Sequence, residues 1–230
     1  LDKVVGRGPF KRWEEAYRHS SKHMNKRHFK FFYDSPYNRK EFFVLLDMVF
    51  ELSSYQKVIK KPIRCRFVPV SEPMTYVTVP TVNSLLGDKL CAFAPHTAGI
   101  TYESGKELEI IKQLHDIGIL FDFMSDRMEV QATYDATVKK EISYCGLSCS
   151  KDDVLKDSFE TAFCCAANGT WKSEDFKMLL RGIDGFRTYT MTAKFTRTVA
   201  AIAACKIMNL AAMLIRNEVD NTSIAAGERR

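Results

Sequence analysis

The sequence predicts an α+β protein, with a β-rich N-terminal part at residues 1–80 and an all-helical part at residues 81–230. The first observation is that four segments are rich in β-branched and aromatic residues, which favour strands; they span residues 28–33, 40–52, 62–70 and 75–80. The second is that apolar residues recur at helical spacing from Thr81 onward. A run of strands followed by a run of helices is typical of α+β folds.

The individual elements follow from turn and capping residues. Residues 10–26 have a helical pattern, and the first two strands are joined by DSPYNR at residues 34–39, whose Asp, Ser, Pro and Asn are common in turns. Beyond the strands we predict six helices, at residues 81–94, 105–123, 128–144, 150–167, 173–186 and 191–217. The residues that we expect to cap helix N-termini are Ser104, Ser150, Ser173 and Thr192.

Composition excludes several classes of protein. With 230 residues, of which 46% are apolar and 27% charged, the chain has the make-up of a globular protein rather than a disordered one. Its seven cysteines are odd in number and scattered, which is typical of reduced thiols in a cytoplasmic protein. Charged residues interrupt the long apolar stretches, so we expect no membrane span.

The net charge of +6 is unevenly distributed. Residues 1–40 contain eleven Lys or Arg against four Asp or Glu, and such a basic segment attracts phosphate groups, above all those of nucleic acids. A solvated surface that keeps the protein soluble accounts equally well for these charges. The charge alone therefore only suggests a phosphate-binding function, and specific residues must support it.

Asp47 is the first charge that packing does not require. It lies within FFVLLDMVF, residues 42–50, which is apolar on both faces of a strand and so predicts a strand covered on each side. A carboxylate in such a place must be compensated for its desolvation. Either a neighbouring Arg or backbone N–H groups hold it at the open end of the strand, or it is a metal ligand or general base.

Lys89 is the second such charge. On a helical wheel it falls between Leu85 and Phe93, inside the apolar stripe of the helix predicted at residues 81–94. A lysine can extend out of such a stripe and keep its ammonium in water. It can also supply the point charge that neutralises a triphosphate in a dry cleft.

Asp116 is the third charge, and helical geometry marks it least. The apolar face of its predicted helix runs through Ile111, Leu114, Ile117 and Phe121, away from Asp116. Lys112 precedes it by four residues, so an exposed ion pair explains both side chains. We expect the neighbouring His115 to lie at the surface or at a helix terminus.

The order of these features resembles a known family. FFVLLDMVFE is followed by VTVPTV, then by LLGDKLCAFAPHTAGI and by KELEIIKQLHDIGILFD. Over residues 41–123 this order resembles the AbiEii/AbiGii-type nucleotidyltransferases, the toxin component of type IV abortive-infection toxin–antitoxin systems. The pieces DKL.AF and KQL.D, at this separation, carry the resemblance.

The resemblance implies a nucleotidyltransferase-like fold, with a mixed β-sheet in the N-terminal part. It also implies Mg²⁺-dependent transfer of a nucleoside monophosphate from an NTP to an acceptor, either RNA, such as a tRNA end, or a protein. Lys89 would contact the phosphates, and Asp116, supported by Lys112, would line the nucleotide pocket. Asp47 would be the third carboxylate of the metal site, where carboxylates clamp the metal ions of such reactions. A cognate antitoxin would be a protein partner.

The sequence departs from the family pattern at one place. The family has a Gly-Ser or Gly-Gly-Thr turn after its first strand and then an Asp-x-Asp pair, and neither is present in these 230 residues. LDKVV resembles the strand before that turn, but GRGPFKRWEEAYRH follows it. Since the chain begins with Leu1, we expect its N-terminus to lie further back. Either the metal-binding segment is missing between residues 5 and 10 or before residue 1, or the chain is a degenerate member that does not catalyse.

Two other functions compete with this prediction. The first is a non-catalytic protein that binds an NTP in the same pocket without transferring it. The second is a basic helical scaffold that binds nucleic acid or an acidic antitoxin through its charge, with affinity that falls steeply as salt rises.

Overall fold

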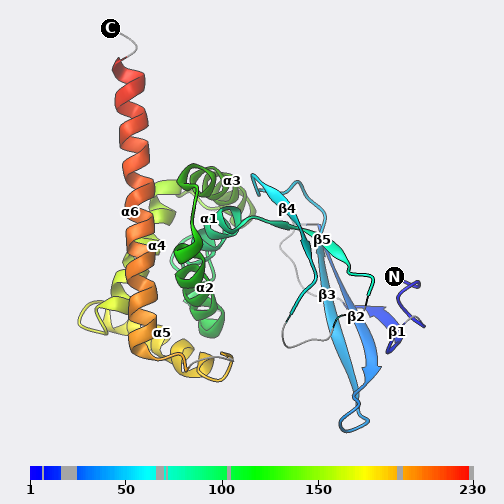
Figure 1. Cartoon of the computed structure of the whole chain (residues 1–230). Helices are drawn as coiled ribbons and strands as arrows, with labels where there is room; N and C mark the ends of the chain where they lie inside the picture. Colours follow the sequence, from blue (N-terminus) through cyan, green and yellow to red (C-terminus); the bar gives the residue numbers. More distant parts are fainter. Residues whose placement is uncertain are drawn as a thin grey trace. The chain divides into compact units, whose positions relative to one another are not determined.

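The computed structural model describes residues 1–6, 8–16, 25–65, 70, 72–102, 105–190 and 194–227, with side chains to residue 216 (Figure 1). The chain divides into two compact units, Leu1–Ser53 and Ser54–Arg230. The predicted α+β class is confirmed, since sheets precede helices along the chain. The units divide earlier than residue 80, because a small second sheet groups with the helices.

The first unit contains one three-stranded antiparallel sheet. Its strands β1 (Phe10–Glu15), β2 (Lys26–Asp34) and β3 (Glu41–Val49) lie in the order β1-β2-β3. The predicted hairpin is confirmed, with Phe31 opposite Val44. The helix predicted at residues 10–26 is wrong over β1, because Trp13 packs on Phe29 at 5.7 Å between ring centroids, and this cross-strand contact favours a strand. Residues 17–24 lie outside the described residues.

The second sheet is a two-stranded antiparallel hairpin. It pairs β4 (Val58–Pro62) with β5 (Tyr76–Pro80), so β5 confirms one predicted strand. The strand predicted at residues 62–70 instead lies earlier, at β4, and residues 66–69 are outside the described part. All strand pairs that the structure describes are antiparallel, whereas the resemblance led us to expect a mixed sheet.

The six predicted helices are all present in the described residues. They are α1 (Val82–Ala92), α2 (Glu107–Leu120), α3 (Arg127–Cys145), α4 (Lys151–Ala166), α5 (Ser173–Phe186) and α6 (Arg197–Gly227). A short 3-10 turn, η2 (Phe121–Phe123), extends α2. The predicted cap Ser150 is confirmed as part of a capping box with Asp153. Ser173 is instead the first residue of its helix, and Ser104 and Thr192 lie outside the described residues.

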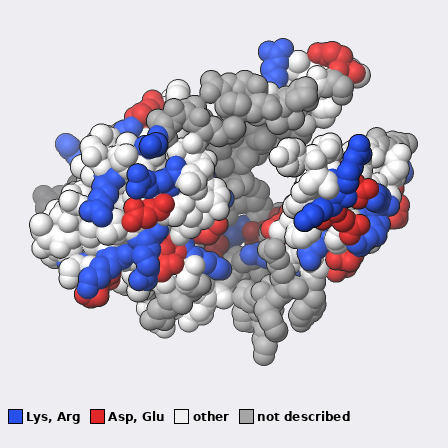
Figure 2. Space-filling view, turned by 90° about the horizontal axis from the view of Figure 1, so that it is seen from below, with Lys and Arg blue, Asp and Glu red and all other residues white. Residues whose placement is uncertain are grey.

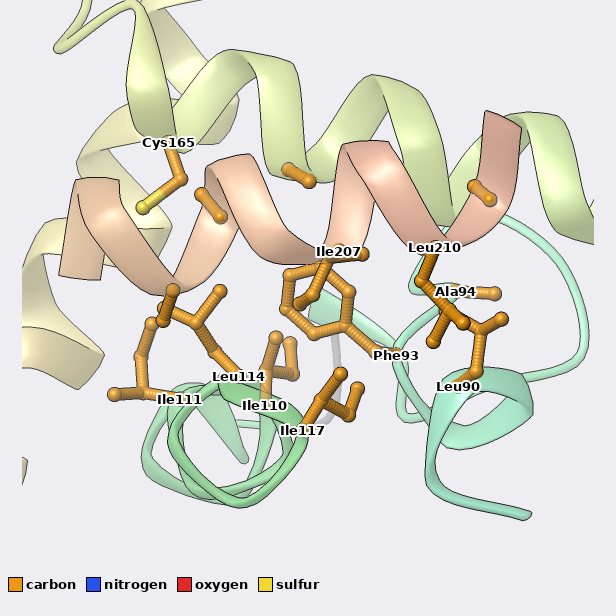
Figure 3. Packing of buried hydrophobic residues seen from close by; sticks show 14 of the residues in the cluster. Leu90, Phe93, Ala94, Ile110, Ile111, Leu114, Ile117, Cys165, Ile207 and Leu210 are labelled. Atoms are coloured by element: carbon orange, nitrogen blue, oxygen red, sulfur yellow. The ribbon is translucent and has the colours of Figure 1, made fainter. Parts of the chain in front are cut away.

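The helices enclose one apolar core, to which all six contribute. Figure 3 shows the ring of Phe93, which follows α1, lying beside Ile207 of α6 and near the isoleucines of α2. Close helix contacts depend on glycine: a Cβ added at Gly118 of α2 would lie 2.7 Å from the Cβ of Ala203 in α6. The core thus fixes α1 against α2, and these two helices carry the motif residues.

The segment Arg197–Arg216 of α6 is the one described helix long and apolar enough, by composition, to cross a membrane. Its mean hydropathy is 1.9, although 39% of it is buried inside the structure. The buried side chains Ala204, Ile207 and Leu210 belong to the core, and Lys206 in mid-helix pairs with Asp122. In this structure the segment is therefore a core helix of the bundle. Its apolar stretch is nevertheless longer than we expected from the sequence.

Candidate functional site

Lys89 of α1 and Asp116 of α2 form an ion pair, with 2.8 Å between Nζ and Oδ2. The ammonium also donates a hydrogen bond to Oε1 of Gln113 at 3.1 Å. Only 22% of the Lys89 side chain and 29% of the Asp116 side chain are exposed. Two of the three charges singled out by the sequence are thus brought together in a partly dry place.

The position of Lys89 follows from how α1 begins and ends. Thr81 caps the helix, since its side chain accepts a hydrogen bond from the backbone N–H of Ser84. Leu86 and Leu90 of α1 are fully buried in the core. Lys89 lies next to this buried face, so its ammonium can reach α2 but has little access to water.

Glu129 of α3 holds the start of α1. Its carboxylate is buried and accepts hydrogen bonds from the hydroxyls of Thr81 and Ser84 and from Nδ2 of Asn83, and Lys57 Nζ lies 3.4 Å from it. Burial raises the pKa of Glu129, but these hydrogen bonds lower it more, so the net pKa lies below its usual value. A charged, fully hydrogen-bonded carboxylate therefore anchors α1 to α3.

The ion pair also governs the electrostatics of Asp116. Burial raises the pKa of this carboxyl. The hydrogen bonds from His115 and Lys89 together lower the pKa by more than burial raises it, so the net pKa lies below its usual value. His115 Nδ1 lies 3.4 Å from Asp116 Oδ1. The ring of His115 also packs against Phe186 and Phe195, so this histidine is half-buried rather than at the surface as predicted.

A second carboxylate adjoins the ion pair. Asp88, the neighbour of Lys89, accepts a hydrogen bond from the Tyr55 hydroxyl at 3.4 Å. Burial raises the pKa of Asp88, while Tyr55 and Lys89 oppose the shift. Burial and the charge of Asp88 raise the pKa of Tyr55 to about 12, so this hydroxyl stays protonated at neutral pH and can act as a donor.

Lys112 does not support Asp116 in the way that we predicted. Its Nζ lies 3.7 Å from Glu109, three residues earlier, and about half of its side chain is exposed. Asp116 pairs with Lys89 on another helix instead of with Lys112 on its own. The reason is burial, because a half-buried carboxylate gains more from a half-buried partner than from a solvated one.

Asp47 lies in a different environment from the one predicted. Its side chain is 53% exposed, and Oδ1 lies 2.6 Å from His28 Nδ1 on the neighbouring strand. The prediction of a strand covered on both faces is wrong, since most side chains of β3 are exposed. Asp47 belongs to the first unit and the Lys89–Asp116 pair to the second, so the convergence of all three residues stays a prediction.

The described residues do not fit the Mg²⁺ site that the resemblance implies. Among them, no group of three or more His, Cys, Asp or Glu side chains is arranged to hold a metal ion. Asp47, the expected ligand, contacts His28 in the described part of the chain, and His28 is not a second carboxylate. We therefore derive no step that passes through a metal ion.

Three cations of the strands β1 and β2 pair with carboxylates in the described part of the chain. Arg12 pairs with Glu41 at 2.8 Å, Arg27 with Glu15 at 2.8 Å, and Lys11 with Asp34. Figure 2 shows the same pattern on the face in view, where Lys and Arg lie beside Asp and Glu. These three cations therefore add little net positive charge to the surface of the sheet.

Several residues of the site were not found from the sequence. Gln113 and Tyr55 carry no local pattern, because their roles depend on contacts between helix and loop segments far apart in the chain. Glu129 had a signal, since it shares a helix stripe with Thr133 and Thr137, beside the apolar stripe of α3. A charged residue at a buried register of a helix requires hydrogen-bonding partners.

The arrangement offers one cation that can exchange partners. Lys89 has three N–H donors, of which the structure assigns two, to Asp116 and Gln113. A phosphate oxygen approaching Lys89 would meet an ammonium already held in place by Asp116, whose other carboxylate oxygen lies 3.4 Å from the imidazole of His115. We found no protein-family model, curated protein or solved structure that matches this chain.

Proposed function

We propose that this chain is a nucleotidyltransferase-like protein that binds a nucleoside triphosphate through Lys89. The observation that carries the proposal is the contact between Lys89 and Asp116, 2.8 Å apart on two helices. The resemblance predicts a phosphate-binding lysine and a pocket aspartate at these two positions. An exposed i,i+4 pair on α2 would have left Lys89 and Asp116 without a common role.

Lys89 would neutralise part of the triphosphate charge. An ammonium in a partly dry site interacts more strongly with phosphate than one in water. Gln113 and Asp116 orient the ammonium before a nucleotide arrives, which reduces the entropy lost on binding. Asp116 must then share Lys89 with the phosphate or release it.

Transfer to an RNA or protein acceptor, with Mg²⁺, is the activity that the resemblance predicts. The described residues support nucleotide binding more directly than transfer. They include an ammonium group that can bind phosphates, that of Lys89, but no set of side chains arranged to hold a metal ion. A binding protein that does not transfer the nucleotide is therefore the second candidate function.

One experiment separates these two functions. The melting temperature is measured with each of the four NTPs and Mg²⁺, and α-³²P-labelled NTPs are incubated with the protein and total RNA or a protein extract. A rise in melting temperature together with a labelled acceptor supports transfer. A rise without any labelled product supports binding alone. No rise with any NTP contradicts both.

A further inference from the structure

A group of aromatic rings adjoins the Lys89–Asp116 ion pair. His115 of α2, Phe186 at the end of α5 and Phe195, which precedes α6, pack together with their ring centroids 5.1 to 5.6 Å apart. We call these three rings the aromatic cluster. Because its members come from three separate segments of the helical unit, the core of that unit fixes the cluster in place beside the ion pair.

His115 is the member of the aromatic cluster that a ligand can reach. Phe186 and Phe195 are only 6% and 2% exposed, whereas 25% of the His115 side chain is exposed. The two buried rings therefore support the imidazole from the core and leave part of its side chain open. A ring that is already held in one orientation loses little conformational entropy when a ligand packs on it.

Asp116 connects this ring to the ammonium of Lys89. One oxygen of its carboxylate, Oδ2, lies 2.8 Å from Lys89 Nζ, and the other, Oδ1, lies 3.4 Å from His115 Nδ1. A single carboxylate group therefore separates a cation from an aromatic ring. In a nucleotide the ribose separates the phosphates from the base by a similar length, so the cation and the ring have the spacing that a nucleotide requires.

We propose that the imidazole ring of His115 stacks on the base of the bound nucleotide and is the residue through which the site distinguishes a nucleotide from a bare triphosphate. The inference rests on the proposed function, because the phosphates bound by Lys89 bring the base to the ring. Histidine is among the side chains on which nucleobases stack in proteins. Such stacking increases affinity by about fivefold or more for each base.

A purely structural role for His115 makes different demands on the side chain. If His115 only holds the carboxylate of Asp116, it needs the ring nitrogen Nδ1 that lies 3.4 Å from Oδ1. If it stacks on a base, it needs an aromatic face and does not need that nitrogen. Phenylalanine keeps the face and lacks the nitrogen, so a substitution by phenylalanine separates the two roles.

The test is a calorimetric titration of the whole chain with two ligands. One is the NTP that raises the melting temperature most, and the other is ribose 5-triphosphate, which carries a hydroxyl where the NTP carries its base. The NTP should bind at least about fivefold more tightly. His115→Leu should abolish this advantage and leave the affinity for ribose 5-triphosphate unchanged, whereas Lys89→Met should weaken both. Phe163→Leu, which removes a partly exposed ring of α4, should bind both ligands like the wild type.

His115→Phe should keep most of the advantage of the NTP. If it loses as much as His115→Leu, His115 only positions Asp116 and the inference is wrong. The comparison of the two ligands in the unmodified protein remains informative if a variant does not fold, which circular dichroism would reveal. Equal affinity of the unmodified protein for both ligands overturns the stacking of the base and leaves phosphate binding by Lys89 intact. Binding of neither ligand contradicts the proposed function and this inference together.

Discussion

Ser84 of α1 donates a hydrogen bond of 2.8 Å to Glu129 of α3, and both side chains are buried. The same carboxylate accepts hydrogen bonds from Thr81 and Asn83, so it binds the whole first turn of α1. Because Lys89 lies about one and a half turns beyond Ser84 along α1, the position of the proposed phosphate-binding ammonium depends on this buried carboxylate. Glu129 is a positioning residue in this account.

Replacing Glu129 by Ala should lower the free energy of unfolding by about 3 kcal/mol, because the buried donors of Asn83 and Ser84 and the part-buried hydroxyl of Thr81 lose their acceptor. Urea unfolding followed by circular dichroism measures the change. Glu109→Ala on α2 is the control, since Glu109 is exposed and pairs only with Lys112 among the described residues, and it should change stability by less than about 0.5 kcal/mol. Equal effects of the two substitutions would show that Glu129 does not anchor α1.

Acid should weaken the same anchor. Burial raises the pKa of Glu129, but the hydrogen bonds from Thr81, Ser84, Asn83 and Lys57 lower it to a net value below usual. A depressed pKa in the folded state contributes stability above the unfolded pKa of about 4.3, and this contribution disappears as pH falls through the folded pKa.

The stability difference between the wild type and Glu129→Gln should therefore be largest near pH 7 and should shrink below about pH 4. Urea midpoints measured for both proteins over this range give the difference directly. A difference that stays constant or grows on acidification would mean that the carboxylate is not preferentially stabilised in the folded state.

Gly118 tests the packing of α2 against α6. A Cβ at this position would lie 2.7 Å from the Cβ of Ala203, so Gly118→Ala should destabilise the protein by about 1–3 kcal/mol despite the higher helix propensity of alanine. Gly185→Ala is the matched control, because its new methyl would meet only a flexible methyl group of Leu108, at 3.1 Å. Thermal melts of the two variants should differ in this order, and the reverse order would contradict the close packing of α2 and α6.

The helical part of the fold could be predicted well because its signals are local. Ser150, followed by Asp153, predicted a helix start that the structure confirms as a capping box. The segment at residues 10–15 could not be predicted correctly, because its strand depends on Trp13 packing against Phe29 in another strand. A local pattern cannot report such a long-range contact, and here it overrides the helical spacing.

The candidate site was predictable in part for the same reason. Lys89 was conspicuous because a charge interrupts an apolar stripe, and that stripe is a local property. The partner of Lys89 could not be recognised in this way. The spacing alone predicted that Asp116 pairs with Lys112, whereas in the structure Asp116 of α2 pairs with Lys89 of α1. Asp47 misled us because the apolar run around it lies on an exposed strand rather than a covered one.

The central claim is that Lys89 binds the phosphates of a nucleoside triphosphate, and calorimetric titration with the NTP that raises the melting temperature most tests it directly. Lys89→Met keeps the aliphatic stem in its apolar surroundings and removes the charge, so it should weaken binding at least tenfold, the equivalent of about 1.4 kcal/mol. Lys156→Met, which removes an exposed lysine of α4, should bind like the wild type. If Lys89→Met and Lys156→Met bind the nucleotide equally well, Lys89 is only a structural partner of Asp116 and the proposed function is wrong.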